Sequence, residues 1–514
     1  MTISELLAER AREHGNRTFV LFDHKEIGFQ EFSDTSGRVA ANLAARGVGK
    51  GEKVVLMMGN CLEFLYCFFG FGRIGAVMVP VNPTLSFEEY VFIINDSDAV
   101  ALVIPAEFAP LLPRLRDALP KIRHFFIVDG EAEGAEPFSV LTEPVEIPET
   151  MAAGEASDAA LIYTSGTTGA PKGVILTHGN YYWNTLAMAH SNRLSRADRF
   201  LCILPLFHVN AQVVSVLTPL MVGGSVAVMG GRFTPFGIFP AIEEYRPTIM
   251  SAVPTIYGIM CRLPKATSYD ISSIRFFVSG AAPLPEEIYN AVRQVLKKTL
   301  IMGYGLSEAT CASAVADHED PIRWNSVGPA LRYTGVRIVN EDGQDVPVGG
   351  VGEILVSGPT VMKGYYNNPE ATAEVLQNGW LKTGDLGRLD NQGYLYVVDR
   401  VKDMIIRGGQ NIYPAQIEQV IIRLPQVDEV AVVGVPEPTW GQEVLAVIKL
   451  LPEATLTEKE VFDFCKEHLG AYKRPKFVRF VEELPKTAIG KVRKNELAKQ
   501  YADLCRHSGG SARS

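Results

Sequence analysis

The stretch Tyr163-Thr-Ser-Gly-Thr-Thr-Gly-Ala-Pro-Lys-Gly173 concentrates hydroxyl groups, glycines and one lysine in eleven residues. The hydroxyls of Ser165, Thr167 and Thr168 can donate to oxyanions, and the glycines allow backbone N–H groups to approach the same oxygens without a Cβ clash. Lys172 adds a positive point charge. Because these groups suit a polyphosphate, the chain is expected to bind a nucleotide.

The flanks of this stretch distinguish a phosphate loop from an ordinary surface loop. Short segments of Ser, Thr and Gly are by default exposed loops. Here residues 159–163 are apolar and predict a short buried strand, and a second apolar run follows at 174–178. A glycine-rich loop that leaves a strand is typical of phosphate binding. The order differs from the Walker A pattern, because the lysine follows Pro171 and is not followed by Ser or Thr.

Strand-like apolar runs alternate with helical patterns over much of the chain, which favours α/β layers with largely parallel sheets. From about residue 335 the pattern changes to strands and turns, as in 336–343 and 352–356, and predicts a β-rich, partly barrel-like subdomain. Further on, an amphipathic helix is expected near 414–423. The alternating runs are 53–58, 76–80, 100–104, 125–128, 249–252, 276–279 and 300–302.

Length, charge and cysteine content limit the classes of protein to which the chain can belong. A chain of 514 residues needs more than one core, and its apolar fraction of 47% is that of a folded globular protein. The net charge of −9 argues against nucleic-acid binding as the main task, because there is no basic excess to neutralise phosphates. Seven cysteines without a C-x-x-C pair predict reduced thiols in a cytoplasmic protein, and the first residues lack a secretory apolar segment.

Residues 201–231 contain no Asp, Glu, Lys or Arg and are long enough to span a bilayer. Pro205 and the Gly223-Gly224 pair interrupt this apolar run. We therefore expect a strand, a loop, a buried helix near 210–222 and a second strand, with no transmembrane segment. Contact with a membrane surface is left open.

The segment Gly303-Tyr-Gly-Leu-Ser-Glu308 combines an aromatic side chain with a carboxylate. Tyr304 can stack on adenine, which is worth roughly 1–3 kcal/mol, and Gly303 and Gly305 leave room beside it. Glu308 is a hard oxygen ligand that suits Mg²⁺ bridging phosphates. Without further context, the segment is equally a glycine turn that exposes a glutamate.

Three further regions carry groups that suit a nucleotide, although each has an ordinary structural alternative. The turn of small residues at 278–284 can lie flat against a purine. Asp385 can accept from both ribose hydroxyls. Arg400 is a forked donor for ribose or phosphate, whereas Asp399-Arg400 would otherwise be a surface ion pair worth little. The basic segment 485–494 would by itself be a solvated face.

In their order along the chain, these motifs resemble the signature motifs of the adenylate-forming superfamily, which contains acyl-CoA synthetases, peptide-synthetase adenylation domains and firefly-luciferase-like enzymes. Ser307 stands where this family usually has threonine, so the hydroxyl is kept. The resemblance implies an α/β fold, with a large N-terminal domain of two α/β layered subdomains plus a β-rich subdomain, and a small mobile α+β C-terminal domain. The implied ranges are 1–399 for the AMP-binding domain, 400–403 for a hinge, 404–505 for the mobile domain and 506–514 for a disordered tail.

The resemblance also implies an AMP-forming acid–CoA ligase that uses ATP, Mg²⁺ and coenzyme A. A substrate carboxylate would attack the α-phosphorus of MgATP to give an acyl adenylate and pyrophosphate, and the thiol of coenzyme A would then displace AMP. Lys491 would lie at the α-phosphate in the first step, and a swing of the C-terminal domain about Lys402 would withdraw it for the second. The implied pocket is mostly apolar, so a medium aliphatic, alicyclic or aromatic monocarboxylic acid is expected.

Other functions stay open at this point. The chain could adenylate an acid and pass the acyl group to a carrier protein, or oxidise it as luciferase-like relatives do. A nucleotide-binding scaffold with a decayed site is a non-enzymatic alternative. A homodimer is also left open.

The resemblance assigns the site residues one by one. Catalytic roles fall to Lys491, Glu308, Ser307 and His208, and metal binding to Glu308 and Thr168. Contacts with the nucleotide and coenzyme A are assigned to Thr164, Ser165, Gly166, Thr167, Thr168, Gly169, Lys172, Gly280, Ala281, Ala282, Gly303, Tyr304, Gly305, Ser307, Asp385, Arg400, Lys402, Gly408 and Gly409. The acid pocket is assigned to His208, Val209, Gln212, Val213, Gly280, Gly305, Leu306 and Cys311. Without the resemblance, His208 would be an ordinary core histidine, and Gln212 could simply cap buried backbone.

Overall fold

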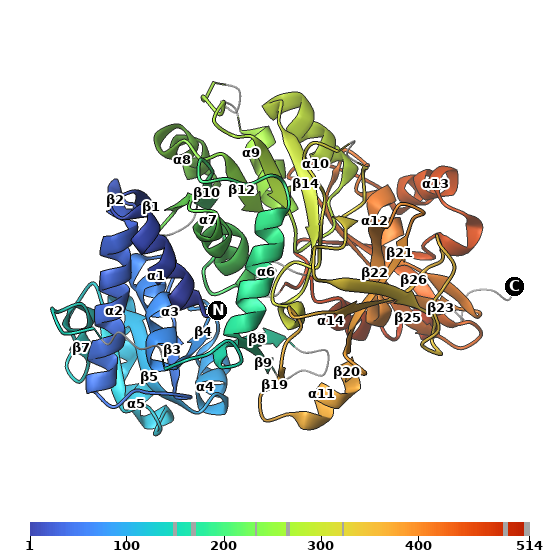
Figure 1. Ribbon diagram of the computed structural model, residues 1–514. Helices are drawn as coiled ribbons and strands as arrows, with labels where there is room; N and C mark the ends of the chain where they lie inside the picture. Colours follow the sequence, from blue (N-terminus) through green and yellow to red (C-terminus); the bar gives the residue numbers. More distant parts are fainter. Residues whose placement is uncertain are drawn as a thin grey trace, which may run out of the picture. The chain divides into compact units, whose positions relative to one another are not determined.

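The first sheet contains eight strands in the order β15-β14-β13-β12-β10-β11-β1-β2 in the computed structural model (Figure 1). The structure describes residues 1–147, 152–165, 171–231, 234–263, 268–320, 323–486 and 492–507. The strands of this sheet are β1 (Thr18–Phe22), β2 (Lys25–Gly28), β10 (Arg199–Cys202), β11 (Ser225–Val228), β12 (Ile249–Ala252), β13 (Phe276–Ser279), β14 (Thr299–Tyr304) and β15 (Ala314–Val315). The pairs from β14 to β1 are parallel, whereas β15 and β2 are antiparallel edge strands. Because the central strands are parallel, the loops after β13 and β14 leave the sheet at the same edge.

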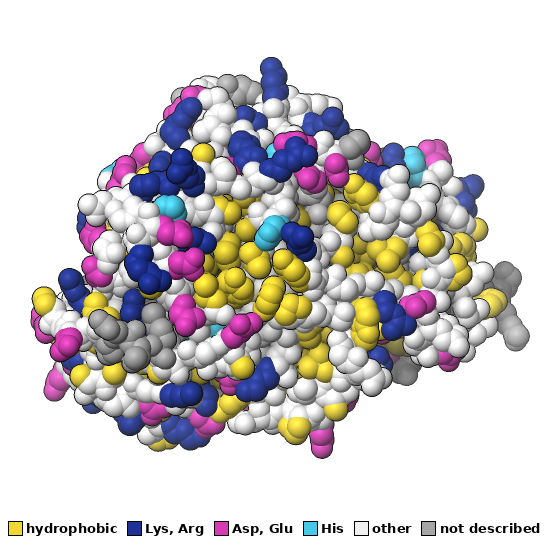
Figure 2. Space-filling view, viewed as in Figure 1, with side chains coloured by type: hydrophobic (Ala, Val, Ile, Leu, Met, Phe, Trp, Pro, Cys, Tyr) yellow, Lys and Arg dark blue, Asp and Glu magenta, His cyan; other side chains and the backbone are white. Residues whose placement is uncertain are grey.

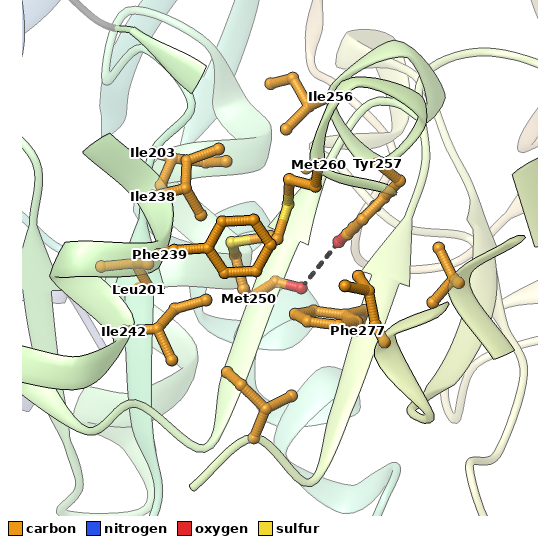
Figure 3. Packing of buried hydrophobic residues seen from close by; sticks show 14 of the residues in the cluster. Leu201, Ile203, Ile238, Phe239, Ile242, Met250, Ile256, Tyr257, Met260 and Phe277 are labelled. Atoms are coloured by element: carbon orange, nitrogen blue, oxygen red, sulfur yellow. Dashed lines mark hydrogen bonds between the residues drawn. The ribbon is translucent and has the colours of Figure 1, made fainter. Parts of the chain in front are cut away.

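Apolar residues from the sheet and from two helices form a core on one of its faces (Figure 3). The helices are α8 (Ile238–Tyr245) and α9 (Pro254–Arg262). Tyr257 on α9 is fully buried, and its hydroxyl donates to the carbonyl oxygens of Met250 at 3.1 Å and Val278 at 2.8 Å. These bonds satisfy the one polar atom that the ring carries into the core.

The second sheet has the order β19-β9-β8-β4-β3-β5-β6-β7 and contains the stretch from Tyr163 to Gly173. Its strands are β3 (Lys53–Leu56), β4 (Val77–Pro80), β5 (Ala99–Pro105), β6 (His124–Val128), β7 (Glu136–Pro137), β8 (Asp158–Ser165), β9 (Pro171–Thr177) and β19 (Gly364–Tyr365). β9 is antiparallel to both of its neighbours, β8 and β19. The predicted strand runs in both sheets are therefore confirmed, and the described ends of the glycine-rich stretch lie in the paired antiparallel strands β8 and β9.

Helices α1 (Ile3–His14), α2 (Phe29–Ala45) and α3 (Leu62–Ile74) pack against one another beside these sheets (Figure 1). Close approach requires a glycine in α3, because a Cβ on Gly70 would lie 2.5 Å from the carbonyl oxygen of Ser36 in α2. The next long helix, α6 (His178–His190), begins with a capping box between Thr177 and Asn180. The remaining helices of this region are α4 (Phe87–Asp96), α5 (Leu112–Ala118) and α10 (Glu286–Ala291).

The uncharged run 201–231 lies within the protein as predicted. β10 is followed by a buried π-helical segment, η3 (Ala211–Leu217), by α7 (Thr218–Met221) and by β11. The expected helix is thus confirmed, but its first half has π geometry, which is common at functional sites. None of the helices in the described ranges has the length and apolar character needed to cross a membrane.

Beyond β15 the chain is rich in strands, as predicted. A third sheet has the order β16-β22-β21-β18-β17, with β20 paired to β21. Its elements are β16 (Gly328–Pro329), β17 (Gly335–Val339), β18 (Gly352–Ser357), β20 (Leu376–Gln377), β21 (Trp380–Leu389) and β22 (Tyr394–Arg400), and α11 (Pro369–Val375) precedes β20.

The chain forms two compact units. The N-terminal unit comprises Met1–Arg337, Leu355–Thr383 and Gly393–Leu395, and the C-terminal unit comprises Ile338–Ile354, Gly384–Gln392 and Tyr396–Ser514. On the face shown in Figure 2, Lys and Arg side chains are interspersed with Asp and Glu side chains.

The C-terminal unit is built on a sheet with the order β24-β23-β26-β25 and a parallel β27 beside β26. Along β25, Val432 faces a core with α12 and α13, whereas Ala431 and Val433 face a second core with α14. This alternation is the period of two expected for a strand covered on both faces. The elements are β23 (Ile405–Arg407), β24 (Gln410–Ile412), α12 (Pro414–Ile421), β25 (Val427–Glu437), β26 (Gly441–Leu450), α13 (Glu458–His468), β27 (Phe477–Val481), α14 (Lys494–Gln500) and α15 (Leu504–His507).

Candidate active site

The glycine-rich stretch joins β8 to β9, and the hairpin register pairs Thr164 with Lys172. Its base is fixed by Tyr163, whose hydroxyl donates to Asp96 Oδ2 at 2.6 Å. A Cβ on Gly173 would lie 3.1 Å from Tyr163 Cζ, so glycine lets the ring lie across the hairpin. The predicted phosphate contacts Gly166, Thr167, Thr168 and Gly169 lie outside the described residues, as does the side chain of Ser165.

The segment after β14 packs closely against the backbone of residues 311–312. A Cβ on Gly305 would lie 1.6 Å from the carbonyl oxygen of Cys311, so no larger residue fits. Tyr304 is 9% exposed, and Glu308 follows in the short 3₁₀ helix η6 (Ser307–Ala309). The buried Asn184 holds the far side of the turn, because its Nδ2 donates to the carbonyl oxygen of Ala312 at 2.8 Å.

Glu308 and Lys172 both lie beside Tyr365 in β19. The hydroxyl of Tyr365 donates to Glu308 Oε1 at 3.0 Å, and Lys172 Nζ lies 5.2 Å from the centroid of the Tyr365 ring. Burial, together with the Glu308 carboxylate, raises the pKa of Tyr365 above its ordinary value, so the phenol stays protonated at neutral pH. The predicted carboxylate and the predicted lysine are thus brought together by a tyrosine.

The turn after β13 lies next to the turn after β14. A Cβ on Gly280 would lie 3.4 Å from the carbonyl oxygen of Gly303. Ala281 adopts a φ of +65° and, with Ala282, is exposed. Gly280 therefore lies close to the backbone of Gly303, while the assigned contact of residues 280–282 with the nucleotide stays a prediction.

The residues assigned to the acid pocket come from three places in the N-terminal unit, which are residues 208–213, the turn after β13 and the turn after β14. Val209 is buried just before the π-helical segment and Val213 is buried within it. The ring of His208 packs against Phe207 with 4.6 Å between centroids. Cys311 is also buried, and burial raises the pKa of its thiol to about 12.

Gln212 is engaged inside the protein. It accepts from the Tyr181 hydroxyl at 2.6 Å and donates to the carbonyl oxygen of Leu206 at 2.8 Å, and it is fully buried. The sequence left two roles open for Gln212, which were contact with the acid and capping of buried backbone. Its contacts favour the second role. Leu306 and Gly305 lie at the turn after β14.

The C-terminal unit holds the other predicted nucleotide contacts. Arg400 Nε donates to Asp385 Oδ1 at 2.8 Å, and Asp385 is 7% exposed. Lys402 lies exposed in the 3₁₀ turn η7 (Val401–Asp403). Gly408 and Gly409 form the turn between β23 and β24, with φ of +57° and +78°, a conformation that favours glycine at both positions.

Two other features of this unit bear on the predicted site. Arg407, which precedes the glycine turn, forms an ion pair with the fully buried Glu443 at 3.0 Å. The predicted catalytic Lys491 lies outside the described residues, as does the segment 508–514 for which a disordered tail was expected.

Sequence reasoning missed Tyr365 and underestimated the part that one lysine of the basic segment plays. Tyr365 was not singled out, although two successive tyrosines follow Gly364 and neighbouring residues of an extended chain point to opposite sides. Lys494 belongs to the segment that resembles a solvated basic face. Its side chain is only 18% exposed, and its Nζ lies 2.7 Å from Glu418 Oε1, so for this residue the alternative of a solvated face is wrong.

Comparisons with known proteins agree with the motifs and the fold. The family model described as AMP-binding enzyme matches residues 7–366, and the model of the AMP-binding enzyme C-terminal domain matches residues 416–491. The chain is 37% identical to a feruloyl-CoA synthase of Amycolatopsis sp., over 96% of this chain and 97% of that protein. It is 35% identical to an indoleacetate–CoA ligase of Aromatoleum aromaticum, over 98% of both chains.

A solved structure of an anthranilate CoA ligase in complex with anthranoyl-AMP superposes with a TM-score of 0.89 at 29% identity, covering 99% of this chain and 98% of that one. The two family models match successive parts of the chain, and the curated relatives and this structure match nearly its full length. The chain therefore belongs to the AMP-binding enzyme family of the adenylate-forming superfamily, and it is an acyl-CoA synthetase of the AMP-forming type.

Proposed function

We propose that this acid–CoA ligase acts on an apolar monocarboxylic acid, which is a medium-length aliphatic, an alicyclic or an aromatic acid. The observation that carries the proposal is the composition of the segments assigned to the acid pocket. Residues 203–217, 278–284 and 299–315 contain no Lys or Arg, and Glu308 is their one acidic residue. A second carboxylate on the acid would need a cation or several donors to offset its desolvation. The names of the relatives, a feruloyl-CoA synthase and an indoleacetate–CoA ligase, agree with an aromatic acid.

The residues have distinct parts in the proposed chemistry. The substrate carboxylate is ionised at neutral pH, because its pKa is near ~4, so it needs no general base. Its oxygen attacks the α-phosphorus as the bond to pyrophosphate breaks. The sulfur of coenzyme A then attacks the carbonyl carbon, and AMP leaves with the oxygen that it gained. Lys172 and the hairpin donors stabilise the phosphate charge, and removal of one such preorganised group typically costs ~10²–10³ in rate.

The residues present fit Mg²⁺, which would neutralise phosphate charge when bound. Mg²⁺ is commonly held by one or two carboxylates together with substrate phosphates and water. Glu308 offers a carboxylate that forms no ion pair with any described Lys or Arg. No cluster of three acidic, His or Cys ligands occurs in the described part of the chain, which suits a metal that depends on the nucleotide for its other ligands. Thr168 remains a second proposed ligand on sequence grounds alone.

The proposed function is tested with a panel of acids. Purified protein is supplied with Mg²⁺, ATP, coenzyme A and one acid at a time, and AMP and acyl-CoA are quantified. We expect equal amounts of AMP and acyl-CoA, with aromatic or medium-length monocarboxylic acids preferred over acetate and dicarboxylic acids such as malonate. A preference for acetate or a dicarboxylic acid would contradict the proposed pocket. AMP formation that needs a carrier protein in place of coenzyme A would contradict the acceptor.

Domain alternation about Lys402 is also part of the proposal. Support comes from the resemblance, which assigns Lys491 to the first half-reaction only. Lys491→Ala is expected to lower adenylation by about 10²–10³ while thioester formation from supplied acyl adenylate is kept. Equal loss of both half-reactions would refute this division.

We also propose a cytoplasmic location, supported by seven cysteines that are all free thiols. Recovery of the native protein in an oxidising compartment by cell fractionation would refute it.

A further inference from the structure

Tyr365 contacts the two groups on which phosphate and metal binding are expected to depend. Its hydroxyl donates to Glu308 Oε1 at 3.0 Å, and its ring lies 5.2 Å from Lys172 Nζ. Cation–π attraction at this distance favours an ammonium group over the ring. Among the described residues, no carboxylate forms an ion pair with Lys172, so the cation is positioned by an aromatic ring instead of an opposite charge.

The strand that carries Tyr365 is held on both sides. β19 pairs with β9, where Tyr365 lies opposite Val174. On the other side the Tyr365 N–H donates to Thr372 Oγ1 at 2.9 Å. Gly364 has a φ of +152°, and a Cβ there would lie 2.9 Å from Thr372 Cγ2, so glycine lets the strand approach α11.

The same segment also holds the backbone of Glu308. The Met362 N–H donates to the carbonyl oxygen of Glu308 at 2.8 Å, and the Thr310 hydroxyl donates to the carbonyl oxygen of Thr360 at 2.6 Å. Main chain and side chain of Glu308 are therefore both fixed to residues 360–365. A displacement of this segment would move the carboxylate and Lys172 together.

The next tyrosine has a different set of partners. The Tyr366 hydroxyl donates to Asp98 Oδ2 at 2.9 Å and accepts from Lys53 Nζ at 3.0 Å. Its N–H donates to the carbonyl oxygen of Gly173 at 2.7 Å. Tyr366 thus anchors the hairpin without contact with Glu308, and it provides a matched comparison for Tyr365.

We infer that Tyr365 is a positioning residue for Mg²⁺-dependent nucleotide binding, because its hydroxyl fixes the Glu308 carboxylate through one oxygen and leaves the other available to the metal. This inference rests on the proposed function of Glu308. Carboxylates that bind metals are generally oriented by such hydrogen bonds. Loss of one of these bonds typically costs about 10–100-fold in metal affinity or activity. The aromatic ring of Tyr365 has a second role, which is to hold Lys172 near the phosphates.

The test measures nucleotide binding instead of turnover. Binding of α,β-methylene-ATP, which cannot be cleaved between the α- and β-phosphorus, is followed by calorimetry with and without Mg²⁺. We expect Tyr365→Phe to bind the analogue without Mg²⁺ as tightly as the wild type does. The factor by which Mg²⁺ increases the affinity should be about tenfold smaller in Tyr365→Phe than in the wild type. Tyr365→Leu, which also removes the ring, is expected to weaken metal-free binding as well.

Tyr366→Phe is the control, because it removes a phenol hydroxyl from the adjacent residue. It should keep the full gain in affinity from Mg²⁺. If Tyr365→Phe also keeps that gain, or if Tyr366→Phe loses it equally, the positioning role is refuted while the proposed function stands. If the wild-type protein binds the analogue equally with and without Mg²⁺, both the positioning role and the metal site in the proposed function are refuted.

Discussion

His178 is a histidine in the interior of the N-terminal unit, at the first position of α6. It is 1% exposed, and neither ring nitrogen has a hydrogen-bond partner among the described residues. A Cβ on Gly72 would lie 2.9 Å from its Cε1, so the ring fills the space that this glycine leaves. Burial lowers the pKa of His178 from 6.5 to about 4, with a smaller effect from the N-terminal amino group. The folded protein therefore holds this imidazole in its neutral form.

This histidine should make stability depend on pH. Between pH 6.5 and pH 4 the unfolded chain binds a proton at His178 that the folded chain does not, so the free energy of unfolding falls as the pH is lowered through that window. The loss at pH 5 relative to pH 7 is about 2 kcal/mol. His178→Leu should remove this part of the difference, measured by denaturant titration at both pH values. A variant that loses as much stability as the wild type between pH 7 and pH 5 would show that His178 does not titrate in this way.

Single residues also show where sequence reasoning stops. Gly305 was expected beside a nucleotide, and its contact with the Cys311 carbonyl agrees with a position where no side chain fits. The partners of Tyr365 and Gln212 could not be predicted, because a sequence alone does not show which distant residues a strand or helix brings together. Glu308 and Tyr365 are 57 positions apart, and their contact depends on the pairing of β19 with β9.

Among the elements, the buried parallel strands were the most predictable, since strands covered on both faces are continuous apolar runs. The π-helical start of the 211–221 segment could not be predicted, because its apolar composition fits an ordinary helix equally well. Lys494, at the start of α14, belongs to a segment whose composition is that of a solvated face, but its side chain forms an internal ion pair. It bonds Glu418 of α12, which also accepts from the Val432 N–H at 2.7 Å.

The ion pair between α14 and α12 should be important for the stability of the C-terminal unit. Burial alone would lower the pKa of Lys494, but the carboxylates of Glu418 and Asp399 raise it above its ordinary value. Lys494→Met leaves Glu418 partly buried without its cation and should cost about 3 kcal/mol in denaturant titrations. Lys499→Met, at an exposed position on the same helix, should change stability by no more than about 0.5 kcal/mol.

The double variant Glu418→Gln/Lys494→Met distinguishes lost pairing from lost packing. If the cost comes from an unpaired carboxylate, removal of that charge should restore part of the stability. A double variant that is less stable than Lys494→Met alone would instead assign the loss to packing around the lysine stem.

In the whole molecule, two sheets of the N-terminal unit place the β8–β9 hairpin, the turn after β13 and the turn after β14 in one region. The C-terminal unit carries the Asp385–Arg400 pair and the glycine turn at 408–409. The family and the two-unit organisation followed from motifs that lie far apart in the sequence. The predicted boundary at 400–403 stays a prediction, because compactness alone divides the chain differently, with 338–354 and 384–392 in the C-terminal unit.

If a bound carboxylate attacks the α-phosphorus of ATP, one of its oxygens is transferred to AMP, and an isotope label on that oxygen tests this step. The enzyme is supplied with Mg²⁺, ATP, coenzyme A and an acid whose two carboxyl oxygens are ¹⁸O, and the products are examined by mass spectrometry. One ¹⁸O should appear in AMP for each acyl-CoA formed, and the other should remain in the thioester carbonyl. Unlabelled AMP, or ADP formed together with labelled inorganic phosphate, would contradict the account.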